Sequence, residues 1–177
     1  MGKLIATTQA TLDGVIDPVG EWVEPGGDHA EYSFERQARS AGLVLGRKTY
    51  EGLAGYWPGE SGKWADMINP MRKWVGSNSL SGDLPWNATL LQGDLEDSIP
   101  RLKDEVDGDL FMHGSGEFAH VMAEKGLIDV FEVYFNPIVW GEGNLHVLGD
   151  RGTVRMRLGD VKRFDSGVVL LTYSPAS

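Results

Sequence analysis

Residues 110–119, LFMHGSGEFA, place a glycine-rich turn directly after an apolar segment. The pattern G-x-G-x-x-A runs from Gly114 to Ala119, between an expected strand and an expected helix. Glycines at these positions let the main chain approach a phosphate and direct helix N–H groups toward it. The segment therefore predicts a strand, turn and helix unit of an α/β fold. A phosphate site and a plain tight turn explain the glycines equally well.

The segments on either side of this unit alternate between strand and helix patterns. Short apolar or β-branched runs bounded by turn residues predict strands, and apolar residues at helical spacing predict helices. We expect strands at 4–8, 15–16, 43–45, 73–76, 89–92, 109–113, 130–136, 154–164 and 168–173. We expect helices at 30–41, 47–53, 64–68, 94–106 and 117–125.

Helices alternate with strands early in the chain, and only strands are expected late. This order predicts a mixed, mainly parallel central sheet flanked by helices, with antiparallel strands at its C-terminal edge. The length of 177 residues fits one domain spanning residues 1–177.

Composition narrows the classes of function. The formal net charge of −10 opposes broad attachment to nucleic acid or to an anionic membrane. The chain has no cysteine, which excludes disulfides and thiolate chemistry, and its four histidines lack metal-ligand spacing, so no metal site is expected. The first residues form no signal peptide or membrane span, and we expect a cytoplasmic location.

Two further strand ends bear groups that suit phosphate. One is the turn Gly46-Arg47-Lys48-Thr49, although a helix start with solvated cations explains it as well. The other is Ser77-Asn78-Ser79. Ligands of α/β sheets bind outside the carboxyl ends of strands. Three such ends favour one extended nucleotide site over three coincidences.

A long loop is expected over residues 17–28, where two prolines and three glycines surround Trp22. Loops of this length often cover a site. Trp57 lies in a second glycine-rich segment, residues 55–59. Trp22 and Trp57 are therefore the candidates for covering a flat substrate ring, although aromatic side chains belong more often to the core.

Six motifs follow one another along nearly the whole chain. They are Thr11-Leu12-Asp13-Gly14, Gly46-Arg47-Lys48-Thr49-Tyr50-Glu51, Lys73-Trp74-Val75-Gly76-Ser77-Asn78-Ser79-Leu80, His113-Gly114-Ser115-Gly116, Gly126-Leu127-Ile128-Asp129 and Asn136-Pro137-Ile138-Val139-Trp140-Gly141-Glu142-Gly143. In order and spacing they resemble the reductase domain family of the bifunctional riboflavin-biosynthesis deaminase/reductase, itself similar to dihydrofolate reductase. The resemblance implies a dihydrofolate reductase-like three-layer αβα fold.

The resemblance also implies NADPH as the cofactor. It puts Arg47, Thr49, Ser77 and Ser79 around the adenosine 2′-phosphate and the turn Gly114-Ser115-Gly116 at the diphosphate. It puts Asp13 and Gly14 beside the nicotinamide, where Asp13 orients the substrate or relays a proton. Hydride transfer belongs to the cofactor, so the protein mainly positions the two rings and excludes water.

The function implied is an NADPH-dependent reductase of a small heterocycle. A phosphoribosylaminopyrimidinone is the specific substrate option, a pterin or an unrelated heterocycle is the alternative, and a homodimer is implied as well. The alternative from another class is a nucleotide- or pterin-binding module without turnover. The chain departs from the family at Gly76, where a β-branched residue is usual, and at Asn144-Leu145-His146, where a basic residue and Leu-Phe are common.

Overall fold

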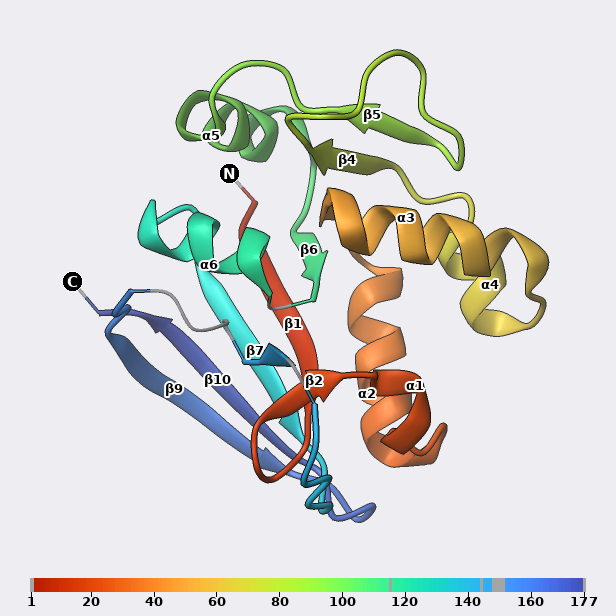
Figure 1. Cartoon of the computed structure of the whole chain (residues 1–177), viewed down its shortest axis with the longest axis vertical. Helices are drawn as coiled ribbons and strands as arrows, with labels where there is room; N and C mark the ends of the chain where they lie inside the picture. Colours follow the sequence, from red (N-terminus) through yellow and green to blue (C-terminus); the bar gives the residue numbers. More distant parts are fainter. Residues whose placement is uncertain (1, 115, 144, 148–151, 177) are drawn as a thin grey trace.

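The computed structural model describes residues 2–114, 116–143, 145–147 and 152–176. It is built on an eight-stranded sheet in the order β5-β4-β3-β6-β1-β7-β10-β9, drawn in Figure 1. Neighbouring strands from β5 to β7 are parallel, and β10 and β9 are antiparallel. The strands are β1 (Leu4–Ala10), β3 (Gly42–Gly46), β4 (Lys73–Gly76), β5 (Ala88–Leu90), β6 (Leu110–His113), β7 (Val130–Phe135), β9 (Met156–Arg163) and β10 (Val169–Pro175). The mainly parallel sheet with an antiparallel C-terminal edge is confirmed.

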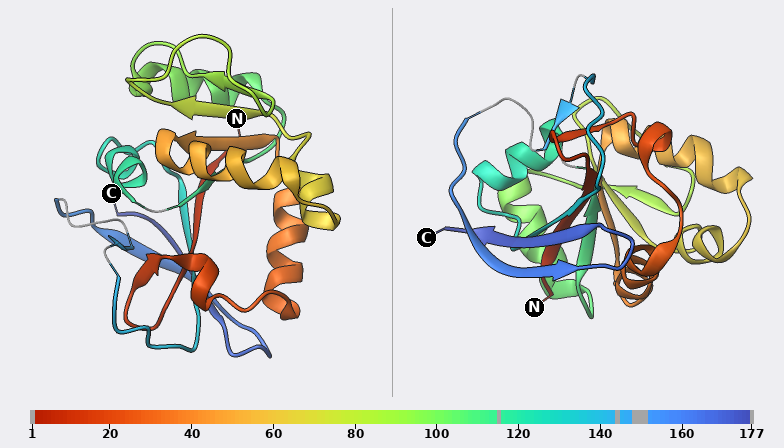
Figure 2. Two further views of the ribbon diagram at one scale, coloured as in Figure 1. Left: turned by 45° about the vertical axis from the view of Figure 1, so that its right-hand side comes forward. Right: turned by 90° about the horizontal axis from the view of Figure 1, so that it is seen from below.

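Helices cover both faces of this sheet, as Figures 1 and 2 show. They are α1 (Val19–Trp22), α2 (Gly27–Ala38), α3 (Arg47–Tyr56), α4 (Lys63–Ile68), α5 (Leu95–Glu105) and α6 (Glu117–Glu124). One core cluster joins α5 and α6 to one face, and another joins α3 and α4 to the opposite face, where α2 also packs. The three-layer αβα architecture is therefore confirmed. In the part of the chain that the structure describes, no helix is long and apolar enough to cross a membrane.

Burial follows position in the sheet. The central strand β3 is buried along its whole length, which explains why its sequence is continuously apolar. The edge strand β9 is exposed almost throughout and bears charged residues at several positions. Charges on an edge strand oppose pairing with another chain through its free backbone groups.

The segment predicted as a loop at residues 17–28 is more ordered than expected. It contains the helix α1, and α2 begins at Gly27, three residues before the predicted start. The Trp22 side chain is only 5% exposed, so burial of this large ring fixes the segment against the body of the protein. Tertiary packing here outweighs the turn signals of the prolines and glycines.

A second difference concerns Trp57. The helix α3 continues to Tyr56, and a 3₁₀ turn, η1 (Trp57–Gly59), follows directly. The predicted loop at residues 55–59 is therefore wrong for its first part. Gly52 and Gly55 weaken an isolated helix, but Tyr50 is buried and Leu53 packs against the core, which holds the helix together.

The structure also contains a small second sheet, of which only the first strand was predicted from the sequence. The strand β2 (Val15–Asp17) pairs with β8 (Leu145–His146) in an antiparallel arrangement. A strand of two residues shows no alternation of polar and apolar residues, so β8 could be identified only from its pairing with β2 in the structure.

Candidate functional site

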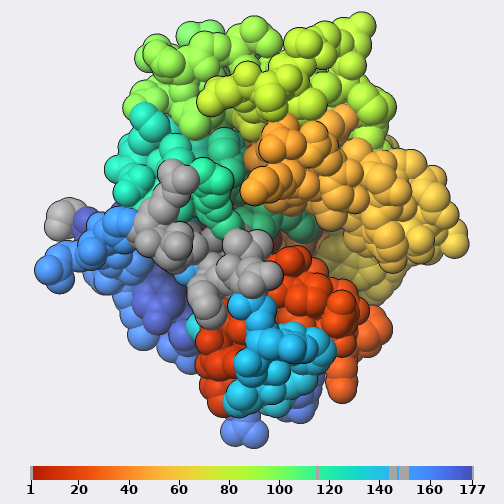
Figure 3. All heavy atoms as spheres, in the orientation of Figure 1, coloured from red at the N-terminus to blue at the C-terminus, as the bar shows by residue number. Residues whose placement is uncertain are grey.

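The three strand ends selected from the sequence lie side by side. The strand β3 is hydrogen-bonded to β4 on one side and to β6 on the other, and Gly46 lies opposite Gly76 in the parallel register. The residues that follow these strands therefore emerge at one edge of the sheet. Figure 3 shows α3 and α6 on the same face of the molecule.

The glycine turn after β6 contacts the start of α3. Gly114 has a φ of +83°, and a Cβ atom placed on it would lie 3.1 Å from Oγ1 of Thr49. Both the left-handed backbone and the short distance favour glycine at this position. Gly116 then precedes the first residue of α6. Ser115, the third residue predicted for this turn, lies outside the described residues.

The cation and hydroxyl groups at this edge are accessible. The Arg47 guanidinium is 2.8 Å from a carboxylate oxygen of Glu51, and both side chains are substantially exposed, at 40% and 46%. Ser77 Oγ accepts the N–H groups of Ser79 and Leu80 at 3.1 and 3.0 Å, which shapes the turn after β4. The two serine hydroxyls are 3.5 Å apart. Arg47, Ser77 and Ser79 thus belong to adjacent strand ends.

Phe118 fills the space that two of these glycines leave open. A Cβ atom placed on Gly46 would lie 2.7 Å from Cβ of Phe118, and one on Gly76 would lie 2.6 Å from its ring. These distances are shorter than van der Waals contact. The departure at Gly76 therefore has a physical reason, because a β-branched side chain there would overlap the Phe118 ring.

Asp13 holds two loops together at the end of β1. Its carboxylate accepts hydrogen bonds from the Thr11 hydroxyl at 2.6 Å and from the Trp140 and Gly141 N–H groups at 3.1 and 2.9 Å. These donors, the Thr11 hydroxyl first, lower the pKa of Asp13 to about 2. An ionised, fully engaged carboxylate suits a positioning role better than the donation of a proton.

Gly14, the partner of Asp13 in the motif, has a φ of +85°, and within the described part of the chain no atom lies within 4 Å of the position of a Cβ. Its carbonyl accepts the N–H of Val147 at 3.2 Å. The turn at residues 11–14 follows β1, and β1 is the next strand after β6 in the sheet. Asp13 and Gly14 therefore continue the line of strand ends that begins at Ser77.

The two candidate tryptophans occupy different places. Trp57 is half-buried and packs against the core cluster that joins α3 and α4 to the sheet. Its ring therefore contributes to the packing of that core. Trp22 is buried on α1, and its Nε1 has no hydrogen-bond partner within the described residues. Participation of Trp22 and Trp57 in a substrate pocket stays a prediction.

A row of polar residues that the sequence patterns did not predict lies beneath α2. His113, Thr7 and Glu132 lie opposite one another in the register of β6, β1 and β7. The helix α2 faces them with Arg36 and Gln37: Arg36 forms an ion pair with Glu132, and Gln37 Oε1 is 2.7 Å from Nε2 of His113. The available signal was a polar residue at an inward position of each of three apolar strands.

Burial shifts the pKa values of two residues in this polar row. Burial lowers the pKa of His113 to about 4, so its imidazole is neutral at pH 7. Burial also raises the pKa of Glu132, while the neighbouring Arg36 opposes that rise. Oε2 of Glu132 and Nε of Arg36 are buried without a hydrogen-bond partner in the described part of the chain.

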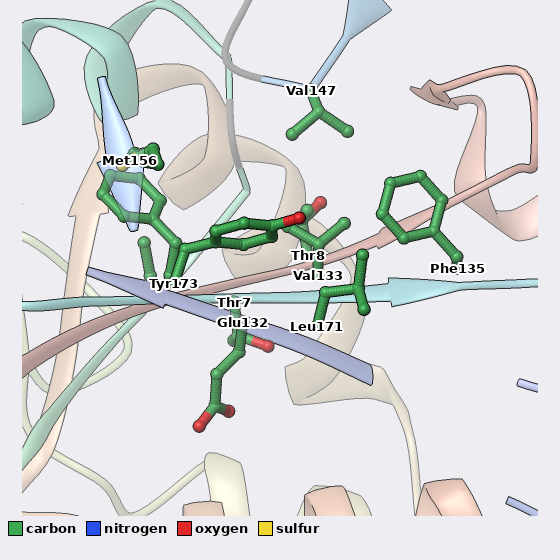
Figure 4. Close-up of a pocket in the computed structure, with 11 residues that line it drawn as sticks. Thr7, Thr8, Glu132, Val133, Phe135, Val147, Met156, Leu171 and Tyr173 are labelled. Carbon is green, nitrogen blue, oxygen red and sulfur yellow. The ribbon is translucent and has the colours of Figure 1, made fainter. Parts of the chain in front are cut away.

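An apolar cavity of about 220 Å³ lies on the opposite face of the sheet. Figure 4 shows Val133, Leu171 and Tyr173 on its floor and Val147 above, with the Glu132 carboxylate pointing away from it. A heterocycle with several polar atoms would find few partners here. Thr7 and Glu132 contribute to its lining, but the charged group of Glu132 lies on the α2 side of the sheet, where it pairs with Arg36.

A mainly parallel sheet with this line of turns at its carboxyl edge defines a dihydrofolate reductase-like α/β protein. The chain belongs to the RibD C-terminal domain family, whose model matches residues 2–170. It is 22% identical over 180 residues to uncharacterized protein YyaP of Bacillus subtilis, covering 97% of this chain and 94% of YyaP.

Two solved structures illustrate the shared fold. One, a putative riboflavin biosynthesis protein from Shewanella sp. PV-4, superposes with a TM-score of 0.74 at 20% identity and 99% coverage of both chains. The other, dihydrofolate reductase from Enterococcus faecalis complexed with NADP(H), superposes with a TM-score of 0.59 at 19% identity, covering 99% of this chain and 98% of that one.

The described residues contain no group of three or more histidine, aspartate or glutamate side chains placed to hold a metal ion.

Proposed function

We propose that this protein is an NADPH-dependent reductase that transfers a hydride to a small heterocyclic substrate. The observation that supports this most directly is the spatial order of the strand ends. Across the sheet they run β4, β3, β6, β1, bearing first Ser77 and Ser79, then Arg47 and Thr49, then the Gly114 turn and finally Asp13. This differs from their order in the sequence, and it matches an extended dinucleotide.

The residues at these strand ends suit both phosphate-bearing parts of NADPH, the 2′-phosphate and the diphosphate. Arg47 and the two serine hydroxyls suit the 2′-phosphate, because a guanidinium is a permanently charged fork for phosphate oxygens. Gly114 and Gly116 suit the diphosphate, because their lack of side chains lets it approach the N-terminus of α6. These local groups make binding compatible with the overall charge of −10.

The nicotinamide of bound NADPH would supply the hydride. The chain's own residues would bind and orient the rings: Asp13 fixes the loop at residues 140–141 beside the end of β1, and Gly14 leaves that turn open. The names of the similar structures, a putative riboflavin biosynthesis protein and a dihydrofolate reductase with NADP(H), support a reductase of a pyrimidinone or pterin ring. Cytoplasmic location and a homodimer stay predictions from the sequence.

The test is a fluorescence titration of NADPH and NADH against the wild-type protein and Arg47→Ala. We expect the wild type to prefer NADPH and the variant to lose that preference, because only the 2′-phosphate distinguishes the two cofactors. Arg39→Ala is the matched control: Arg39, like Arg47, pairs with a glutamate four residues away on a helix, but it lies at the end of α2.

Two results would contradict parts of the proposal. Absence of binding for both nucleotides would refute the cofactor assignment altogether. Tight NADPH binding without oxidation against pyrimidine and pterin compounds would favour the alternative, a binding module without turnover. Asp13 gives that alternative some support, because its carboxylate is engaged and does not offer a proton.

A further inference from the structure

Phe118 lies between the two sets of residues that we propose to bind the phosphates of NADPH. It is the second residue of α6, two residues after Gly116, and its side chain lies against both Gly46 at the end of β3 and Gly76 at the end of β4. Arg47 and Ser77 are the residues that follow these two glycines. The ring therefore lies between the groups for the diphosphate and those for the 2′-phosphate.

The adenosine of NADPH links those two phosphates covalently. Neighbouring strands in a sheet are about 4.8 Å apart, so the groups after β4 and those after β6 are separated by about 10 Å with β3 between them. Any adenosine that reaches both must pass over the end of β3. Gly46 is the last residue of β3, and the Phe118 side chain lies against it.

The ring is also suitable as a surface for a base. Phe118 is half-buried: it packs against the core cluster beneath α5 and α6 but is not fully enclosed by it. Gly46 and Gly76 fix its position, because any side chain on either would displace it. Stacking of a base on a fixed aromatic ring contributes substantially to affinity and needs no specific hydrogen bond.

We propose that Phe118 is the platform on which the adenine of the cofactor rests, and that Gly46 and Gly76 are glycine so that the ring can lie across the two strand ends. This rests on the proposed NADPH-dependent function and adds the residue that positions the adenosine half. In a purely structural role, the ring would only fill the gap above the two glycines.

The experiment compares calorimetric titrations of NADPH and of adenosine 2′,5′-bisphosphate, which lacks the nicotinamide, against wild type and Phe118→Leu. Loss of the ring should weaken both ligands by a similar factor of about ten, because adenine is common to them. The matched control is Phe34→Leu, which removes another half-buried ring, on α2, that packs against Trp64. Circular dichroism checks that each variant is folded.

The outcomes separate this inference from the proposed function. If the wild type binds neither ligand, the cofactor assignment itself is wrong. If the wild type binds NADPH but folded Phe118→Leu binds both ligands within twofold of it, the platform is refuted while the cofactor stands. Should Phe118→Leu not fold, nuclear Overhauser contacts in the wild-type complex decide: contacts between the Phe118 ring and adenine H2 or H8 support the platform, and their absence refutes it.

Discussion

Nε2 of His113 lies 2.7 Å from Oε1 of Gln37, at the point where β6 ends and the glycine turn begins. The Gln37 amide nitrogen donates to Ser33 at 2.9 Å, so its oxygen faces His113 and accepts from it. Neutral His113 is thereby held with its proton on Nε2. The helix α2 is tied to the strand that leads into the candidate cofactor turn.

This contact predicts a pH-dependent stability. Because burial lowers the pKa of His113 to about 4 from 6.5, the unfolded chain binds its proton first as the pH falls. Stability due to neutral His113 is therefore complete above about pH 6.5 and declines toward pH 4, by an amount on the order of 3 kcal/mol. Urea unfolding at pH 7 and pH 4.5 measures it.

The control is His113→Gln, which can still donate to Gln37 but does not titrate. Its unfolding free energy should fall less than that of the wild type over the same pH interval. Identical pH dependence in the two proteins would show that His113 is not the group responsible.

The ion pair between Arg36 and Glu132 is largely buried, with side-chain exposures of 33% and 4%. Glu132→Gln should cost about 3 kcal/mol of unfolding free energy, because it leaves the guanidinium without its counter-charge. The double variant Arg36→Met with Glu132→Leu should recover most of this loss.

Chemical denaturation of the two variants tests this expectation. Glu96→Gln is the control, since Glu96 pairs with Lys125 on the surface at side-chain exposures of 52% and 37%, and its loss should cost less than about 1 kcal/mol. Equal losses for Glu132→Gln and Glu96→Gln would contradict the importance of burial.

Gly76→Val introduces a β-branched side chain at the end of β4. We expect a loss of about 1–3 kcal/mol, because the new Cβ overlaps the Phe118 ring. Adding Phe118→Ala should remove most of that penalty, so a double-mutant cycle measured by denaturation should give a clear coupling energy.

Gly52→Ala is the control for glycine replacement. Among the described residues outside the helix's own backbone, no atom lies within 4 Å of a Cβ at this position in α3, and alanine favours a helix, so the variant should be slightly more stable. Additive effects of Gly76→Val and Phe118→Ala would mean that the ring does not restrict position 76.

Asp13→Asn should loosen the loop at residues 140–141. An asparagine has one acceptor oxygen in place of the two that bind the Trp140 and Gly141 N–H groups. Hydrogen–deuterium exchange of these two amides should therefore accelerate, while amides in the pairing of β9 with β10 keep their wild-type rates as an internal reference.

The same carboxylate predicts no titration near neutral pH. Its pKa is lowered to about 2, so its contribution to stability is present above its ordinary pKa of 3.8 and is lost as the pH falls toward 2. Any activity profile between pH 5 and 9 should have no limb that disappears in Asp13→Asn. The appearance of such a limb would contradict this prediction and support Asp13 as a proton relay.

Local patterns predicted much of the sheet. The run at 43–45 is continuously apolar because β3 is buried on both faces, and Gly126, which adopts a positive φ, follows the end of α6 where the sequence predicted the helix to stop. The glycine turns at residues 46 and 114 were recognised because a close approach of the main chain requires glycine, so the residue type itself indicates the turn. The pairing of β2 with β8 left none, since it joins segments far apart in the sequence.

The sequence by itself determined the class of fold and the three turns that suit phosphate, because periodicity and glycine placement are local properties. Only the tertiary structure decided the order of those turns across the sheet, since strand neighbours are chosen by packing over the whole chain. The tertiary structure also decided the environments of Phe118, His113 and Glu132. Contacts over Gly46 and Gly76, and burial beneath α2, arise from residues that the sequence separates, so no local pattern encodes them.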